Sequence, residues 1–331
     1  MTSPAYEVVG IGNAIVDVLA HADEDQLARL GLAKGVMTLI DAAEAERLYG
    51  AMGPGIECSG GSAANTMAGF AALGGRAAYI GKVRDDQLGE VFRHDIRAAG
   101  VAFDSPAATE GPATARCLIF VTADAQRTMQ TYLGACVELG PEDVNEALVA
   151  SAAVTYLEGY LWDQPRAKEA FLKAARAAHG AGRKVALSLS DPFCVGRHRE
   201  SFLELIAGHV DILFANEAEI TALYQGTFDE ALVQVRGHCE IAALTRSEKG
   251  STVVTADQVI VVGAVTPEAL VDTTGAGDLY AAGFLFGLAR GLPLAECALL
   301  GGVAAAEIIS HYGARPEDDL KALAADYIAN L

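Results

Sequence analysis

Apolar positions along the chain fall into short runs that alternate with longer stretches of helical periodicity. Short, compact apolar runs are typical of buried strands. The strand candidates are residues 6–12, 76–83, 152–161, 184–190, 210–216, 240–247 and 251–264. The helix candidates are residues 62–73, with Ser62 as the N-cap, 86–100, 164–182, 197–209 and 217–224, followed later by two alanine-rich helices. This alternation predicts an α/β fold: a doubly wound, mostly parallel sheet with helices on both faces.

Two stretches interrupt the alternation. Residues 18–41 include GVMTLID, and residues 112–133 read as two strands joined by TADAQR, which predicts a hairpin. We interpret both as parts of a small β-lid over the open end of the sheet. The alternative is that they are additional edge strands without a lid role. Because no linker divides the chain, we expect a single domain over residues 1–331, with a lid formed by about 18–41 and 112–133.

Composition and charge narrow the class of protein. The chain has 331 residues, of which 52% are hydrophobic and only 10 are proline, as in a globular protein. Its formal net charge of −19 disfavours nucleic acid and anionic membranes as partners. An anionic ligand must therefore be held locally, by helix N-termini and a few basic side chains. Small molecules are the expected partners.

The six cysteines are widely spaced and form no C-x-x-C pair, which favours reduced, buried thiols. The N-terminal stretch lacks the pattern of a secretory signal, and the apolar run after Asp278 stops at Arg290, too short to span a bilayer. These features predict a cytoplasmic protein. The sequence leaves open whether it is a monomer or a homodimer.

Residues 272–278 read DTTGAGD and run directly into an apolar helix. At a helix N-terminus, the amides of Gly275, Ala276 and Gly277 would form an anion hole. Asp278 in the first turn can cap the helix. It can also accept a proton from an alcohol that attacks a phosphate held by those amides. A glycine-rich turn alone leaves both roles open.

DTTGAGD resembles the second signature of the ribokinase-like (PfkB) carbohydrate kinases, and GGSAAN at residues 60–65 resembles their first signature. The resemblance extends over essentially the whole chain. It implies an ATP- and Mg²⁺-dependent kinase in which Asp278 is the catalytic base and Gly275, Ala276 and Gly277 form the anion hole. Arg127 matches a lid arginine that reaches the transferred phosphate; the alternative is a surface arginine without a ligand.

The same resemblance implies a nucleotide site and a cation site. Asn216 and Glu219 match a motif that acts near Mg²⁺ and the phosphates, although both also suit a simple helix start. Thr245 and Gly250 match a loop that lines the ATP site. Asp272 and Thr274 match positions that often bind a monovalent cation such as K⁺; turn capping is the alternative.

For the acceptor, GGSAAN is closest to the adenosine kinase branch of the family. Asp17 suits vicinal hydroxyls, because a carboxylate accepts a pair of hydrogen bonds. The predicted acceptor site consists of Asn13, Asp17, Gly60, Gly61 and Asn65 around the sugar, with Leu39, Met129, Tyr160 and Phe193 clasping a base. The last four also suit core or lid packing. The stretch LWDQPR after Tyr160 is not typical of adenosine kinases.

The expected reaction is therefore phosphorylation of the primary hydroxyl of a nucleoside. Adenosine is the expected substrate, and AMP is its product. One alternative is a sugar kinase of the ribokinase or fructokinase type. A second is a non-catalytic relative that senses nucleosides or sugars.

Overall fold

The computed structural model describes residues 4–124 and 126–329 of the chain. Its main sheet has eight strands in the order β13-β12-β11-β10-β9-β8-β1-β5. The strands β11, β10, β9, β8, β1 and β5 pair in parallel with their neighbours in this order. At the other edge, β12 pairs antiparallel with β11, and β13 pairs antiparallel with β12. The strands are β1 (Tyr6–Ile11), β5 (Ala77–Ile80), β8 (Ala152–Glu158), β9 (Lys184–Ser188), β10 (Ile212–Asn216), β11 (Ile241–Thr245), β12 (Ser251–Val254) and β13 (Val259–Val262).

Helices cover both faces of this sheet, and each face has its own hydrophobic core. One core contains side chains of α3 (Ser62–Ala72), α4 (Gln87–Ala98), α10 (Ala276–Ala289), α11 (Leu294–Ile308) and α12 (Leu320–Ala329). The other contains side chains of α5 (Glu146–Ser151), α6 (Pro165–Gly180), α7 (Pro192–His209), α8 (Glu217–Tyr224) and α9 (Phe228–Val235). The predicted doubly wound, mostly parallel α/β fold is confirmed.

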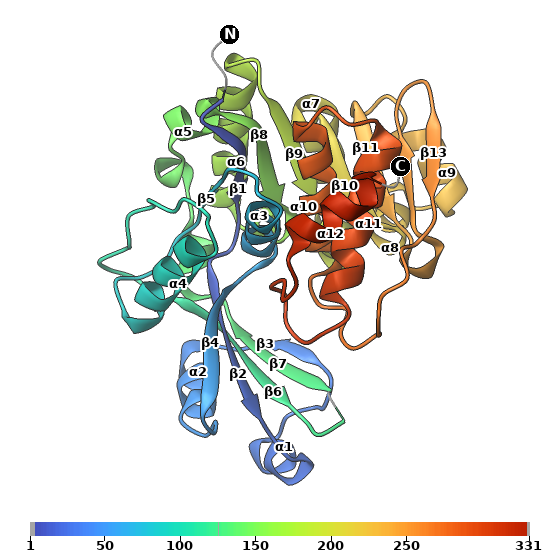
Figure 1. The fold of residues 1–331 in the computed structure, drawn as a ribbon. Helices are drawn as coiled ribbons and strands as arrows, with labels where there is room; N and C mark the ends of the chain where they lie inside the picture. Colours follow the sequence, from blue (N-terminus) through green and yellow to red (C-terminus); the bar gives the residue numbers. More distant parts are fainter. Residues whose placement is uncertain (1–3, 125, 330–331) are drawn as a thin grey trace.

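A second, five-stranded sheet in the order β3-β7-β6-β2-β4 projects from one end of this body (Figure 1). We refer to it as the lid sheet. Its strands are β2 (Ile15–His21), β3 (Met37–Leu39), β4 (Gly55–Gly60), β6 (Ala115–Val121) and β7 (Arg127–Tyr132). Two short helices, α1 (Glu24–Leu30) and α2 (Ala42–Tyr49), bury Leu27 and Leu48 in the same core as Val16 and Val18 of β2.

The lid sheet is larger than the ranges 18–41 and 112–133 suggested. Strand β2 begins at Ile15, and β4 lies outside both ranges. The tip of the β6–β7 hairpin includes position 125, which lies outside the described residues. The glycine-rich sequence GPGIECSGG hides β4, because glycine and proline usually indicate a loop rather than a strand.

The six cysteines are free thiols, as expected. Four of them are buried, whereas Cys58 and Cys239 are only partly buried, contrary to the prediction. Within residues 4–124 and 126–329, none of the helices is long and apolar enough to cross a membrane.

Candidate active site

A cavity of about 1290 Å³ runs between the lid sheet and the carboxyl ends of the main strands. Ligands of doubly wound folds bind at this edge, because the helices that follow the strands begin there. The predicted site residues in its wall are Asp17, Gly61, Asn65, Arg127, Met129, Tyr160, Asn216, Glu219, Thr245, Gly250, Thr274, Gly275, Ala276, Gly277 and Asp278. The fold therefore gathers most of the predicted positions around one space.

Five predicted residues lie outside this wall. Asn13, Gly60 and Asp272 lie next to the wall residues Gly61, Asp17 and Arg127, respectively. Phe193 is 76% exposed, and Leu39 is 60% exposed beside a separate, smaller cavity. The structure therefore gives no support to Phe193 and Leu39 as parts of a base-binding slot with Tyr160 and Met129. Phe193 lies in the first turn of α7, and Leu39 on the outermost strand of the lid sheet.

Asp278 lies half-buried in the first turn of α10 and receives two side-chain hydrogen bonds. Ser62 Oγ donates to its Oδ1 over 2.6 Å, and Asn65 Nδ2 donates to its Oδ2 over 3.1 Å. Burial raises the pKa of Asp278 to about 6, although these two bonds and the positive charge of Arg315 act to lower it. Asp278 is thus held in a fixed orientation, with a proton affinity suited to a general base near neutral pH.

The N-terminus of α10 provides donors beside this carboxylate. Gly275 is the N-cap residue, has φ of 81°, and has no side chain to satisfy the amides of the first turn. The first backbone N–H groups of a helix have no partner within the helix, and the helix dipole adds positive potential there. Since Gly275, Ala276 and Gly277 all line the cavity, this helix end can bind an anionic group next to Asp278.

Ser62 is not the N-cap of α3, contrary to the sequence prediction. Gly61 is the N-cap, and Ser62 is the first helical residue, which leaves its hydroxyl free to bond Asp278. Gly61 has φ of 97°, and a Cβ there would lie 2.2 Å from the carbonyl oxygen of Asn13. A side chain at this position is therefore excluded by both conformation and space.

Asp17 lies on the cavity face of β2, between two cysteines of the neighbouring strands. Cys58 of β4 and Cys117 of β6 are its register partners. Burial raises the pKa of Asp17 to about 6; Arg315 and Arg127 act to lower it, and the negative charge of Asp278 acts to raise it. Asp17 is the single ionisable carboxyl among the β2 residues that line the cavity.

Glu158, which the sequence analysis missed, is a buried carboxyl at the end of β8. It accepts hydrogen bonds from the backbone N and Nδ2 of Asn13 and from the backbone N of Ala63. Burial raises the pKa of Glu158 to about 7, although these hydrogen bonds act to lower it. Glu158 thereby joins the end of β1 to the start of α3, the helix that presents Ser62 and Asn65. Its sequence context, YLEGYL, shows only an acid at a strand end.

Arg127, near the hairpin of the lid sheet, pairs with the loop that precedes α10. Its Nη2 lies 2.9 Å from Oδ2 of Asp272, and both side chains are nearly buried, at 7% and 11% exposure. The guanidinium also lies over the Tyr312 ring. Asp272 Oδ1 accepts from the backbone N and the hydroxyl of Thr274. Asp272 therefore anchors the turn, and its charge is matched by an arginine.

At the far end of the cavity, Asn216 and Glu219 form a reciprocal capping box at the start of α8. The Asn216 side chain accepts from the Glu219 backbone N, and the Glu219 carboxylate accepts from the backbone N and Nδ2 of Asn216. Burial raises the pKa of Glu219 to about 7. The capping role is therefore present, and both side chains also face the cavity.

The cavity also has an apolar wall formed by α11. Ala298, Gly302, Ala305 and Ile309 recur on one side of α11 and its end, and Gly302 lies beside Val265 in the loop after β13. Residues three or four positions apart share a helix face, so this wall is continuous. Small side chains leave room there for a planar group.

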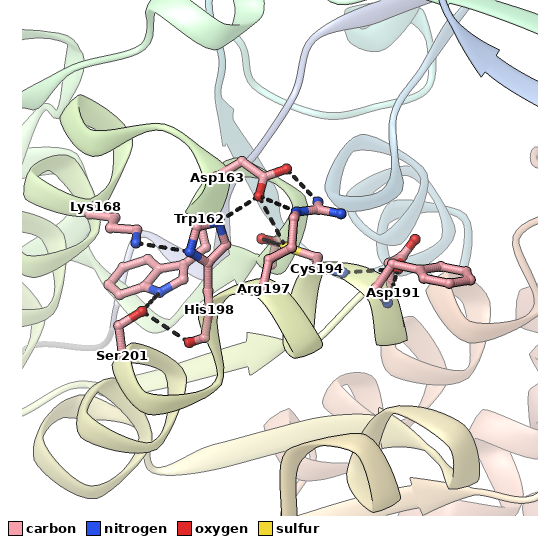
Figure 2. Close-up of polar contacts among 10 residues, drawn as sticks. Trp162, Asp163, Lys168, Asp191, Cys194, Arg197, His198 and Ser201 are labelled. Atoms are coloured by element: carbon pink, nitrogen blue, oxygen red, sulfur yellow. Dashed lines mark hydrogen bonds and ion pairs between the residues drawn. The ribbon is translucent and has the colours of Figure 1, made fainter.

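The unusual LWDQPR stretch supports the segment that carries Tyr160. Asp163, the last residue of the 3₁₀ helix Gly159–Asp163, receives hydrogen bonds from Arg197 (2.7 Å) and His198 (2.6 Å) of α7, as Figure 2 shows. Helix α7 is kinked at His198, whose φ and ψ are −123° and 23°. The stretch thus fastens one wall of the cavity to α7.

Arg315, in the loop after α11, is a second residue that the sequence analysis missed. It lines the cavity and influences the pKa of both Asp17 and Asp278. GARPEDD contains no motif that indicates a site, and only the fold brings it to these acids.

Comparisons with known proteins agree with this geometry. Residues 56–320 match the model of the pfkB family carbohydrate kinases. The structure of an adenosine kinase from Sinorhizobium meliloti is 56% identical, with 97% of this chain and 99% of that chain covered and a TM-score of 0.89. A probable sugar kinase from Rhizobium etli is 50% identical, with coverage of 99% and 100% and a TM-score of 0.90.

Among curated relatives, a 5-dehydro-2-deoxygluconokinase from Geobacillus thermodenitrificans is 28% identical over 76% of this chain and 79% of its own. The named relatives are kinases of sugars or nucleosides, which leaves no support for the alternative of a non-catalytic relative. The chain belongs to the pfkB family of carbohydrate kinases, and is an enzyme that transfers phosphate from ATP to a hydroxyl group of a sugar or nucleoside.

Proposed function

We propose that the protein is an adenosine kinase, which transfers the γ-phosphate of ATP to the 5′-hydroxyl of adenosine and releases AMP and ADP. The observation that carries this proposal is the pattern of side chains on the cavity face of the lid sheet. The 56% identical adenosine kinase from Sinorhizobium meliloti supports it.

The cavity face of the lid sheet includes two rows set by strand register. In one row, Ile56, Leu19, Ile119 and Met129 lie side by side across four strands. In the next row, Cys58, Asp17, Cys117 and Thr131 do the same. All eight side chains line the cavity. Ile15 and Arg127 of the lid sheet also line the cavity. The lid therefore offers one carboxylate and one guanidinium on an otherwise mainly apolar surface.

This surface suits a nucleoside better than a free sugar. Asp17 can accept hydrogen bonds from the two vicinal hydroxyls of a ribose, and the aliphatic row can cover a purine ring. A free sugar carries hydroxyls around its whole ring, and those facing the aliphatic row would lose water without gaining a partner. Each such group costs about 1–3 kcal/mol.

Asp278 is the proposed base for the transfer. The acceptor hydroxyl gives its proton to the Asp278 carboxylate, and its oxygen forms a bond to the γ-phosphorus. The bond from that phosphorus to the bridging oxygen breaks, and ADP leaves with the electron pair. The amides at the start of α10 stabilise the charge on the phosphoryl group, and lid closure excludes water that would otherwise hydrolyse ATP.

The far end of the cavity is the proposed ATP site. The small-residue face of α11 accommodates the adenine ring, and Thr245 and Gly250 line the same cavity. Mg²⁺, when bound with ATP, would supply positive charge to offset that of the phosphates. Asn216 and Glu219 fit a hydrated ion, because their side-chain oxygens are already engaged in the capping box and would act through water.

Two predicted roles involve the Arg127–Asp272 pair. Arg127 lines the cavity, and its Nε has no hydrogen-bond partner within the described residues, so the guanidinium has a donor left for a phosphate. We propose that Arg127 binds the transferred phosphate while Asp272 helps to hold the side chain. A monovalent cation at Asp272 and Thr274 would compete with Arg127 for the Asp272 carboxylate, and the K⁺ site stays a prediction.

The second candidate is a sugar kinase, which the curated relative named 5-dehydro-2-deoxygluconokinase favours. A coupled ADP assay with a panel of nucleosides and free sugars, including adenosine, inosine, ribose, fructose and 5-dehydro-2-deoxygluconate, separates the two. We expect kcat/KM for adenosine to exceed that of every free sugar by at least about 100-fold, as one or two unpaired hydroxyls imply. Turnover of free sugars alone would overturn the proposal.

A further inference from the structure

Arg315 joins the lid sheet to the body of the protein at a hinge. The last lid strand, β4, passes through Gly60 and Gly61 directly into α3. Arg315 Nη2 donates to the carbonyl oxygen (2.7 Å) and hydroxyl (2.8 Å) of Ser59 before this two-glycine turn. Its Nη1 donates to the carbonyl oxygen of Ala64 (2.9 Å) after it. One guanidinium therefore holds both sides of the turn.

Both ends of this connection are themselves anchored. The backbone N and hydroxyl of Ser59 donate to Oδ2 of Asp95 on α4. The loop that carries Arg315 is tied to α11, because Glu307 Oε1 accepts from the backbone N of Glu317 and Asp318. A displacement of β4 relative to α3 would therefore have to break the Arg315 fork rather than move a loose loop.

The charge of Arg315 faces the acids of the site. Asp17 on the lid and Asp278 on α10 both have their pKa lowered by it, against the larger effect of burial. Other charged groups also act here: Arg127 and Asp278 on Asp17, and Asp95 on Arg315 itself. Ser62 and Asn65 bond Asp278 without carrying charge. Arg315 is thus the cation shared by the acceptor-binding acid and the base.

We propose that Arg315 is a positioning residue for phosphoryl transfer, which fixes the two-glycine hinge of the lid and keeps Asp17 and Asp278 ionised when the lid closes over the acceptor. Neither GGSAAN nor DTTGAGD includes it, and it reaches both segments from the loop after α11. The role has two separable parts, the fork of hydrogen bonds and the charge.

Three variants separate these parts. Arg315→Met removes fork and charge, Arg315→Lys keeps the charge but cannot bond both sides of the turn, and Arg97→Met is the control. Arg97 also donates to a backbone carbonyl, that of Phe103, but outside the cavity wall. The kinetic measurement is kcat and the KM for adenosine between pH 5 and 9, and it rests on the proposed function.

In Arg315→Met, we expect the acidic limb of the pH profile of kcat/KM to move up by about one pH unit. The reason is that a neighbouring positive charge lowers a carboxyl pKa by about 1–3 units, and this variant removes that charge. We also expect KM for adenosine to rise about tenfold. Arg315→Lys should restore the acid limb and keep the raised KM. Arg315→Met with an unchanged acid limb and KM would overturn the proposal. If that variant does not fold, an unchanged KM in Arg315→Lys would overturn it.

A second measurement is independent of adenosine. Because burial raises the pKa of Asp17 and Asp278, both acids favour the fold when protonated, and this stability is lost as the pH rises through about 6. We expect Tm to fall more between pH 5 and pH 8 in Arg315→Met than in Arg97→Met. Equal falls would overturn the charge role. If the enzyme does not phosphorylate adenosine but Arg315→Met still shows the larger fall in Tm, the proposed function is wrong and the charge role of Arg315 is supported.

Discussion

The two walls of the proposed acceptor end of the cavity are built in different ways. The inner wall is formed where α3 and α10 begin, from glycines and short polar side chains such as Ser62 and Asn65. The outer wall is the lid sheet, with apolar side chains, two thiols, one threonine, the guanidinium of Arg127 and the single carboxylate of Asp17. The two helices of the inner wall pack side by side in one hydrophobic core of the body, whereas the lid sheet projects from that body (Figure 1).

This difference separates the chemistry from the choice of acceptor. The inner wall holds the proposed base and the proposed anion-binding amides, which any hydroxyl acceptor requires. The outer wall has groups that distinguish one acceptor from another by where they accept hydrogen bonds and where they offer only apolar surface. Changes to the inner wall should therefore lower kcat for every acceptor, and changes to the lid should mainly alter the KM of one.

The largest effect is expected from Asp278→Asn on the inner wall. The amide keeps the size of the side chain but cannot take up the acceptor proton. General base catalysis contributes about 10²–10⁴-fold, so kcat should fall by that factor with a modest change in KM for either substrate. Steady-state kinetics with ATP and adenosine measure this.

The control for this variant is Asp257→Asn, in the exposed turn between β12 and β13. It should leave kcat unchanged. Asp278→Asn with the kcat of the unmodified enzyme would remove Asp278 from its role and would break the distinction between the two walls.

On the lid, Asp17→Asn should raise the KM for adenosine by about 10–100-fold, since hydrogen bonds to a charged group contribute about 1.5–3 kcal/mol. The fall in kcat should be much smaller than that of Asp278→Asn. Asp124→Asn, a lid acid that bonds Lys34 and Thr122 instead of facing the cavity, is the control. A large loss of kcat with unchanged KM would place Asp17 in the chemistry and contradict the division.

The two walls also differ in how far the sequence predicts them. The residues of the inner wall stand in contiguous motifs, DTTGAGD and GGSAAN, because a helix N-terminus is a local structure and its residues are neighbours in the chain. The fold class follows in the same way from local alternation of strands and helices. Even there, Ser62 has a different role from the predicted cap, since the positive φ of Gly61 moves the helix start by one residue.

The outer wall depends on pairing between distant segments. Cys58, Asp17 and Cys117 become neighbours only through the register of β4, β2 and β6, and a shift by one residue would turn every side chain to the other face. Arg315 and Glu158 are hidden for the same reason, because their partners lie 256 and 145 positions away along the chain. Phe193 shows the converse: a motif match placed it at the base, but the first turn of α7 leaves it exposed.

The smallest expected effect tests the aliphatic row of the lid. Ile56 is 72% exposed in the structure and lines the cavity, so its side chain is available to cover a bound base. Ile56→Ser removes about 1 kcal/mol of apolar burial on binding, which corresponds to a rise of about fivefold in the KM for adenosine. Tm should stay unchanged, because an exposed side chain adds little to folding. The matched control is Val233→Ser on α9, at 74% exposure and outside the cavity wall, which should change neither quantity. If both variants leave KM unchanged, the aliphatic row does not contact the acceptor, and the preference for a nucleoside has to arise on the inner wall.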